Sequence, residues 1–199
     1  MTLRIQKIDI SELYEYSKHL KALVPEDRHS RFGSAISDHG IDQIMLQIAY
    51  HPSDHQLWIV HDYNEILGYG HMARSKPDVW ELAVSVEKKH QRKGAGDKLI
   101  TEMLEWAKVQ NIEEVYMHCI EENKVIQHLA SKHNLKTKER GYGERTAAIE
   151  LPDASALEKN NQLFKEYTRL VDEMTELRLR MLGLMLGNTD TTHKENYVK

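Results

Sequence analysis

The spacing of apolar residues changes repeatedly along the chain, and this constrains the fold more than any other sequence feature. Stretches with the every-second-residue spacing of a strand alternate with stretches that have the spacing of a helix. The predicted elements, in chain order, are strand 3–9, helices 10–23 and 41–50, strands 55–62, 65–73 and 79–86, helix 96–110, strand 113–120, helix 123–133, and strands 134–140 and 144–151. The polar segment 24–40 is predicted as a loop.

The order of these elements, β-α-α-β-β-β-α-β-α-β-β, predicts an α/β (α+β) fold. The middle strands follow one another through short turns, one of them at Tyr63 and Asn64, so we expect them to pair antiparallel. The later strands are separated by helices, which permits parallel pairing. A mixed, mostly antiparallel central sheet with helices on both faces follows.

The length of 199 residues allows one well-buried domain and a helical appendage. We assign residues 1–151 to the domain, 152–187 to a long amphipathic C-terminal helix and 188–199 to a flexible tail. The apolar residues of this helix alternate at the spacing of a coiled-coil seam: Leu163, Tyr167, Leu170, Met174, Leu177, Met181 and Leu184. Such a seam needs a partner, either the chain's own domain or a second copy. Charged residues beside the seam favour a homodimer through the C-terminal helix.

Composition and charge exclude several classes of partner. The formal net charge of -4 and the lack of a long Lys/Arg cluster speak against nucleic acid. No apolar run approaches the roughly 20 residues needed to span a bilayer, so we expect no membrane partner. Cys119 is the only cysteine in the sequence, and the N-terminal residues are charged where a signal peptide would be apolar. A cytoplasmic location is therefore predicted.

The 12 histidines raise the question of a metal site. None has the spacing of a known zinc motif, and the nearest pair, His51 and His55, flanks Pro52 in a polar stretch. We therefore expect no metal and place most histidines at the surface. Cys119 is expected to be a small buried thiol rather than a nucleophile.

The stretch "VSVEKKHQRKGAGDKLITEML" passes from a strand through a polar, Gly-containing turn into a helix. The free N–H groups at a helix start, together with the positive end of the helix dipole, bind anions such as phosphate. A dinucleotide fingerprint would need a third glycine where Leu99 stands, and the GK[ST] of a nucleotide P-loop is missing. Both of these nucleotide-binding motifs are excluded.

The spacing that does fit is Q-x-x-G-x-G, formed by Gln91, Gly94 and Gly96, with Val86 before it and Asn123 after the next strand. This combination resembles the acyl-CoA binding motif of the GNAT superfamily of N-acetyltransferases, and the element order over residues 1–150 is similar too. Within the superfamily the chain looks most like the acetyltransferase domain of bacterial protein-lysine acetyltransferases.

The resemblance implies a role for each residue of the motif. Backbone amides from Lys93 to Asp97 would hold the CoA pyrophosphate, and the strand that ends at Val86 would pair with the pantetheine arm. The implied cofactor-binding residues are Val84, Val86, Gln91, Arg92, Lys93, Gly94, Ala95, Gly96, Asp97 and Asn123. Alternatives remain, since Gly96 could serve only close packing and Asn123 only as a helix N-cap. By family position, the segment 24–40 with Arg28, Arg31 and Phe32 would border the acceptor site.

Catalysis requires a base, because an alkylammonium must lose a proton before it attacks a thioester. Glu81 lies on the predicted strand 79–86, out of phase with its apolar residues, and His118 lies where several relatives carry a carboxylate base. We take Glu81 as the preferred base, with His118 as its partner or substitute.

The sequence departs from the family at the residue that protonates the CoA thiolate. Many relatives carry a tyrosine seven residues after the asparagine, and Ala130 stands there in this chain. The candidates for another proton donor are Tyr116, Tyr142 and His133, and the alternative is a thiolate that leaves unaided and takes a proton from water.

The implied function is transfer of an acetyl group from acetyl-CoA, as cosubstrate, to a primary amine by direct attack on the thioester. The acceptor would be an amine-bearing small molecule or a protein lysine. The alternative is a catalytically weak acyl-CoA binding or regulatory module that acts through oligomerisation.

Overall fold

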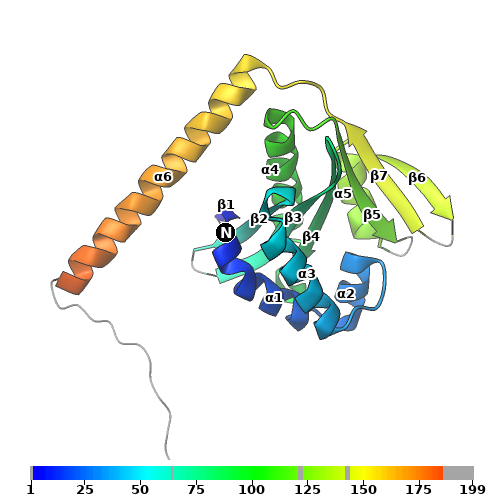
Figure 1. Cartoon of the computed structure of the whole chain (residues 1–199), viewed down its shortest axis with the longest axis horizontal. Coiled ribbons are helices and arrows are strands. Elements are labelled where there is room, and N and C mark those ends of the chain that lie inside the picture. The colour runs from blue at the N-terminus through cyan, green and yellow to red at the C-terminus, as the bar shows by residue number, and fades with distance from the viewer. Residues whose placement is uncertain (1, 64, 121–122, 142–143, 186–199) are drawn as a thin grey trace, which may run out of the picture. The chain divides into compact units, whose positions relative to one another are not determined.

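The computed structural model describes residues 2–63, 65–120, 123–141 and 144–185 (Figure 1). The strands are β1 (Leu3–Ile8), β2 (His55–Asp62), β3 (Glu65–Lys76), β4 (Val79–Val86), β5 (Glu114–Ile120), β6 (Lys136–Gly141) and β7 (Glu144–Glu150). The α-helices are α1 (Leu13–Ala22), α2 (Pro25–Phe32), α3 (Asp38–Tyr50), α4 (Ala95–Val109), α5 (Lys124–Lys132) and α6 (Ala156–Met185), and short 3-10 helices cover Ile10–Glu12, Pro52–Asp54 and Lys88–His90.

The chain divides into two compact units, residues 1–154 and 155–199, and each is described by itself. The second unit contains α6, which covers most of the predicted C-terminal helix, whereas the predicted tail 188–199 lies outside the described residues. None of the described helices has the length and apolar character of a membrane span.

The first unit is built on a sheet in which the described strands follow the order β1-β2-β3-β4-β5-β7-β6. Its neighbouring strands are antiparallel except β4 and β5, which are parallel and are connected through α4. The predicted mixed, mostly antiparallel sheet is therefore confirmed. The parallel pairing of β4 with β5 covers only Val79–Glu81 against Glu114–Tyr116, and beyond it no residues of the two strands are paired.

One sequence prediction was wrong: the segment 24–40 is not all loop, because it contains the helix α2. Its signals are local and specific. Pro25 occupies the first helical turn, acidic residues follow it, and Gly33 ends the helix in a left-handed conformation at φ 72°. The helix is short and polar and has no buried residue, so the apolar periodicity that identified the other helices is missing here.

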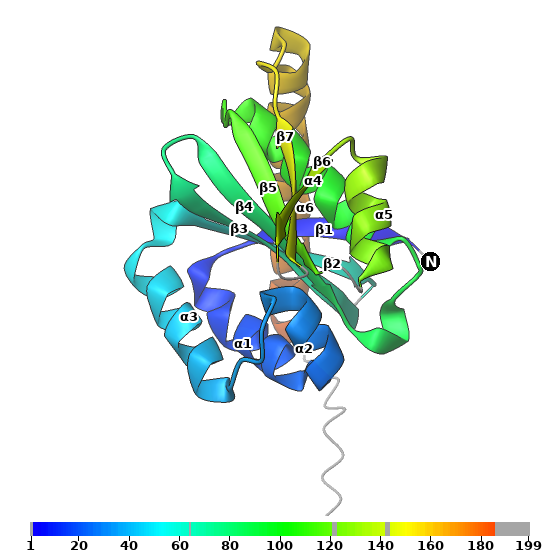
Figure 2. The same ribbon diagram turned by 90° about the vertical axis from the view of Figure 1, so that its right-hand side faces the viewer.

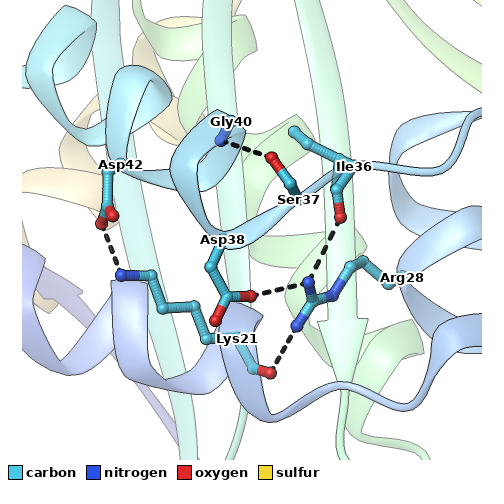
Figure 3. A network of polar contacts seen from close by, with 7 residues as sticks. All are labelled: Lys21, Arg28, Ile36, Ser37, Asp38, Gly40 and Asp42. Atoms are coloured by element: carbon cyan, nitrogen blue, oxygen red, sulfur yellow. Dashed lines mark hydrogen bonds and ion pairs between the residues drawn. The ribbon is translucent and has the colours of Figure 1, made fainter.

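Arg28 fixes α2 between its two neighbouring helices (Figure 3). Its guanidinium donates to the Lys21 carbonyl at the end of α1, to the Ile36 carbonyl at 3.2 Å and to the Asp38 carboxylate at 2.8 Å at the start of α3. Charge-assisted bonds of this kind are among the stronger hydrogen bonds of proteins. They hold a helix that has no fully buried residue and packs against the core through the partly buried Phe32.

Helices α1, α2 and α3 lie on one side of the sheet and α4 and α5 on the other (Figure 2). The strand alternation separates the faces: Trp80 and Leu82 of β4 are buried in the core under α4, whereas Tyr69 of β3 is buried in the core under α1 and α3. Helix α4 comes very close to β3, because a Cβ added to Gly70 would lie only 2.5 Å from Met103 Sδ.

Two buried histidines, His19 and His71, form part of the interface between α1 and the sheet, although most described histidines are exposed or half-buried, as expected. His19 is 7% exposed, and its Nε2 lies 2.9 Å from Ser85 Oγ of β4. Its ring lies 4.6 Å from that of Tyr69. Burial lowers the pKa of His19 to about 4, so the ring is neutral at pH 7.

This burial predicts acid sensitivity of the fold. In the unfolded chain His19 has the ordinary pKa of 6.5, whereas in the folded chain its pKa is about 4. Between these two pH values the unfolded chain binds a proton at His19 and the folded chain does not. The His19 contribution is therefore complete above about pH 6.5 and is lost as the pH falls, by about 2 kcal/mol between pH 7.5 and 5. His19→Gln keeps a donor for Ser85 but cannot titrate.

Urea unfolding of His19→Gln at these two pH values should show a smaller loss of stability than the wild type by about that amount. His39→Gln, at an exposed position, serves as the control and should leave the difference unchanged. An unaltered pH dependence in His19→Gln would contradict the assignment.

Candidate functional site

A cavity of about 530 Å³ opens where β4 and β5 diverge. Its wall is formed by α2, β4, the segment after β4, the start of α4, and the connection from β5 to α5. Of the predicted site residues, those that line it are Glu81, Val84, Val86, Gln91, Arg92, Gly94, Ala95, Gly96, Asp97, His118 and Asn123. Lys93 is exposed and does not line this cavity.

The segment between β4 and α4 has the backbone geometry of an anion site. Arg92 and Gly94 both have left-handed φ values, 60° and 85°, and alternation of this kind turns successive N–H groups toward one side. Helix α4 then starts at Ala95, and no side chain caps it. The N–H groups of its first turn are therefore available to a ligand.

The two glycines of this segment differ in their surroundings. A Cβ added to Gly94 would meet only Leu3 Cδ1, at 3.9 Å, so this position needs glycine for its backbone conformation rather than for protein packing. A Cβ added to Gly96 would be in ordinary contact with Leu129 and Val86, at 3.5 and 3.9 Å. The alternative that Gly96 serves only close packing has no support from these distances.

Residues 87–94, between β4 and α4, are called the anion-binding segment. Gln91 of this segment contacts two walls of the cavity. Its Nε2 donates to the Val86 carbonyl at 3.1 Å and to the Asp27 carboxylate of α2 at 3.2 Å. The predicted member of the motif is thus a brace between the end of β4 and α2.

The carboxylate of Asp97 is engaged by the end of α5. Lys132 Nζ lies 2.8 Å and His133 Nε2 2.9 Å from its oxygens, and the hydrogen bond from Lys132, followed by that from His133, lowers the pKa of Asp97. An acidic residue at the start of α4 is thereby compatible with an anion at the neighbouring amides. His133, a candidate proton donor for the thiolate, is occupied by this contact.

Asn123 caps α5, since its Oδ1 accepts the N–H of Ile126 at 3.1 Å. The capping alternative is therefore observed, but the same residue also lines the cavity. The two roles are compatible, because the cap uses the side-chain oxygen and the amide nitrogen can donate elsewhere.

Glu81 and His118 line the cavity together, on the sheet face that α1 and α2 cover. Glu81 is the last residue of β4 paired with β5, opposite Tyr116, and the Tyr116 ring lies 5.5 Å edge-on from that of His118. Sequence alternation correctly placed Glu81 opposite to Trp80 and Leu82. Both candidate bases thus lie at the point where the strands separate.

Helix α2 contributes Asp27, Ser30 and Arg31 to the cavity wall. Arg31, which was predicted to border the acceptor site, lines this cavity, whereas Arg28 holds the helices together. Asp27 and Ser30 were missed, because recognising them required the helix that Pro25 and Gly33 delimit.

The other residues considered in the sequence do not add to the chemistry of the cavity. Ala130, where many relatives have a tyrosine, lies on α5 and is completely buried in the core, and Tyr142 lies outside the described residues. Cys119 is buried, and burial raises the pKa of its thiol to about 11, so it is not a thiolate nucleophile. In the described part of the chain, no group of three or more His, Cys, Asp or Glu side chains could hold a metal ion.

Comparison with known proteins identifies the fold. The GNAT domain of PAT from S. lividans has a TM-score of 0.64 at 15% identity, covering 76% of this chain and 92% of that one. The PaiA N-acetyltransferase of Thermoplasma acidophilum, in complex with coenzyme A, gives 0.58 at 15%, covering 75% and 99%. The spermidine N-acetyltransferase of Vibrio cholerae, in complex with CoA and spermine, gives 0.59 at 15%, covering 74% and 95%.

No curated protein sequence matches the chain. The family model described as "Acetyltransferase (GNAT) family" matches residues 21–134, which include α2, the anion-binding segment and both candidate bases. The cavity between diverging strands, the left-handed segment before α4 and this match agree, and the chain belongs to the GNAT acetyltransferase family.

Proposed function

We propose that this acetyl-CoA-dependent acyltransferase transfers the acetyl group to a primary amine by direct attack, within the cavity between β4 and β5. The observation that supports this most is the left-handed segment at Arg92 and Gly94, which runs into the uncapped start of α4 at the cavity wall. It offers amides for a pyrophosphate, next to the two candidate bases.

Acetyl-CoA would lie along β4. The backbone of Val84 and Val86 is beyond the paired part of β4 and β5, so its polar groups on that edge can pair with the pantetheine amides. The amides from Lys93 to Asp97 would hold the pyrophosphate, with Arg92 adding positive charge and Asn123 donating to the pantetheine arm.

In the reaction, the unprotonated amine nitrogen forms a bond to the thioester carbonyl carbon, the C–S bond breaks and CoA leaves as the thiolate. The amine proton passes to a base, which we propose is Glu81, with His118 as its partner or substitute. The two face the same cavity as the proposed cofactor site. The thiolate can take its proton from water.

The acceptor is an amine, either a small molecule or a protein lysine. One structural neighbour is a spermidine N-acetyltransferase, so a small-molecule amine is an acceptor for at least one protein of this fold. The alternative of a catalytically weak binding module is less favoured, since the family is one of acetyltransferases. The cytoplasmic location remains a prediction from the sequence.

Gly94→Val tests the cofactor site. The substitution places a β-branched residue at φ 85° and moves the amides that would hold the pyrophosphate. Acetyl-CoA affinity should fall by at least about 2 kcal/mol, roughly thirty-fold, in calorimetry. Gly33→Val is the matched control, because Gly33 also has a left-handed φ, 72°, but does not line the cavity. Equal affinities in the two variants would refute the site.

Glu81→Gln and His118→Ala test the base. Both should still bind acetyl-CoA, while the variant that lacks the base loses on the order of 10² to 10⁴ in turnover, measured as CoA release with an amine acceptor. His39→Ala, at an exposed position outside the cavity, should have wild-type turnover. If both cavity variants retain wild-type turnover, neither residue is the base.

We also propose that α6 mediates homodimerisation. All seven seam residues are more than half exposed, from 51% for Leu170 to 70% for Leu184, in a helix of 30 residues. Leucine recurs every seventh residue on this seam, and Glu173 and Arg178 have the spacing of the interhelical ion pair of parallel coiled coils. A second copy of the helix would cover the apolar surface.

Removal of α6 tests this proposal. Light scattering should give twice the chain mass for the full chain and the single-chain mass for a chain that ends at Ala154. Leu170→Glu combined with Leu177→Glu in the full chain should also give the monomer. An unchanged oligomeric state after truncation would contradict the proposal.

A further inference from the structure

Arg31 is a cationic side chain in the cavity wall for which the described residues provide no carboxylate partner. Its Nη2 lies 3.3 Å from Tyr16 Oη and 3.4 Å from His71 Nδ1, which are long distances for hydrogen bonds. Its Nε is buried and has no hydrogen-bond partner in the described structure. The guanidinium carbon lies 4.8 Å from the Phe32 ring.

The two side chains that contact Arg31 Nη2, Tyr16 and His71, are not carboxylates. A guanidinium can only donate, so His71 Nδ1 must accept, and His71 Nε2 then carries the hydrogen that bonds to His55 Nδ1 at 3.0 Å. Burial, with the charge of Arg31 as the next cause, holds the pKa of His71 well below its usual value. Neither neighbour can therefore compensate the positive charge.

Arg28 of the same helix, in contrast to Arg31, has a carboxylate partner, because its Nη1 lies 2.8 Å from Asp38 Oδ1. A partly buried cation without a counter-ion is unfavourable, and proteins usually pair it. An unpaired guanidinium in the wall of a binding cavity therefore indicates that the missing anion belongs to a ligand.

The strand register places the anion that would bind Arg31 near Glu81, the proposed base, rather than near the anion-binding segment after β4. His71, which contacts Arg31, pairs with Ala83 of β4, and Glu81 lies two residues further along the same face. Asp27, one turn earlier in α2, is the residue that reaches Gln91 next to the proposed pyrophosphate site. Arg31 thus faces the half of the cavity where the amine would react.

We propose that Arg31 binds a carboxylate of the acceptor, so that the preferred substrate is an amine that also carries a carboxylate, as amino acids do. This inference rests on the proposed acetyl transfer. A planar carboxylate suits the guanidinium fork. Asp27 and Glu81 in the same cavity would repel a phosphate dianion more strongly than a carboxylate with a single charge, and a polyamine would bring further positive charge to Arg31.

Matched pairs of acceptors test the proposal, each an amino acid and its own carboxamide, for both an α-amino acid and a longer ω-amino acid. Rates of CoA release are expressed per unprotonated amine, because the carboxylate alters the amine pKa. The wild type should prefer the carboxylate on the order of ten- to a hundredfold in kcat/KM, mainly through KM. Equal use of both members of each pair, or a preference for the carboxamide or for spermidine, would overturn the proposal.

Arg31→Gln should abolish this preference and leave acetyl-CoA affinity unchanged, while Arg31→Lys should keep part of it. Arg4→Gln, at an exposed arginine of β1 that does not line the cavity, should keep the preference. A preference that persists in Arg31→Gln would overturn the proposal. If Arg31→Gln does not fold, the comparison of acceptor pairs on the wild type decides alone.

Failure of the proposed function gives a different result. If acetyl-CoA does not bind, or if no amine releases CoA, acetyl transfer is refuted or left without an acceptor. Calorimetric titration of the acceptor pairs into the protein then tests Arg31 directly, and equal affinities overturn its assignment. Turnover of carboxamides without a carboxylate preference would overturn only the inference about Arg31.

Discussion

The short pairing of β4 with β5 is the constraint on which the rest of the site depends. The two strands share a register only from Val79 to Glu81, and their backbones are unpaired with each other beyond it. Unpaired backbone groups must find partners elsewhere, and a ligand lying along the strand provides them. The same divergence brings the ends of β4 and β5, with Glu81 and His118, into one cavity with the start of α4.

Polar contacts between elements add to the apolar packing that holds the walls of this cavity. Arg28 ties α2 to α1 and α3, Gln91 ties α2 to the end of β4, and Asp97 ties α4 to α5. The contacts of Gln91 and Asp97 join elements that both line the cavity. Such charge-assisted bonds orient the elements with more geometric specificity than apolar contacts provide.

The sequence predicted the strands, α4, α5 and the anion-binding segment because each has a local signal: apolar alternation, a helical stripe or Gln91 with its two glycines. It also placed Glu81 on the correct face. Helix α2 was missed because none of its residues is buried, so only its terminal signals at Pro25 and Gly33 mark it. The contact of His19 with Ser85, 66 residues apart in sequence, depends on tertiary packing and has no local signal.

The most direct test of the central claim is hydrogen exchange of the full chain with and without acetyl-CoA. The amides of Val84 and Val86 and those from Lys93 to Asp97 should exchange more slowly with the cofactor, because they would donate to pantetheine and pyrophosphate. Protection of both segments, with β1 and β2 unaffected, is the predicted result. Protection confined to other parts of the chain, or no change at saturating acetyl-CoA, would contradict the proposed site.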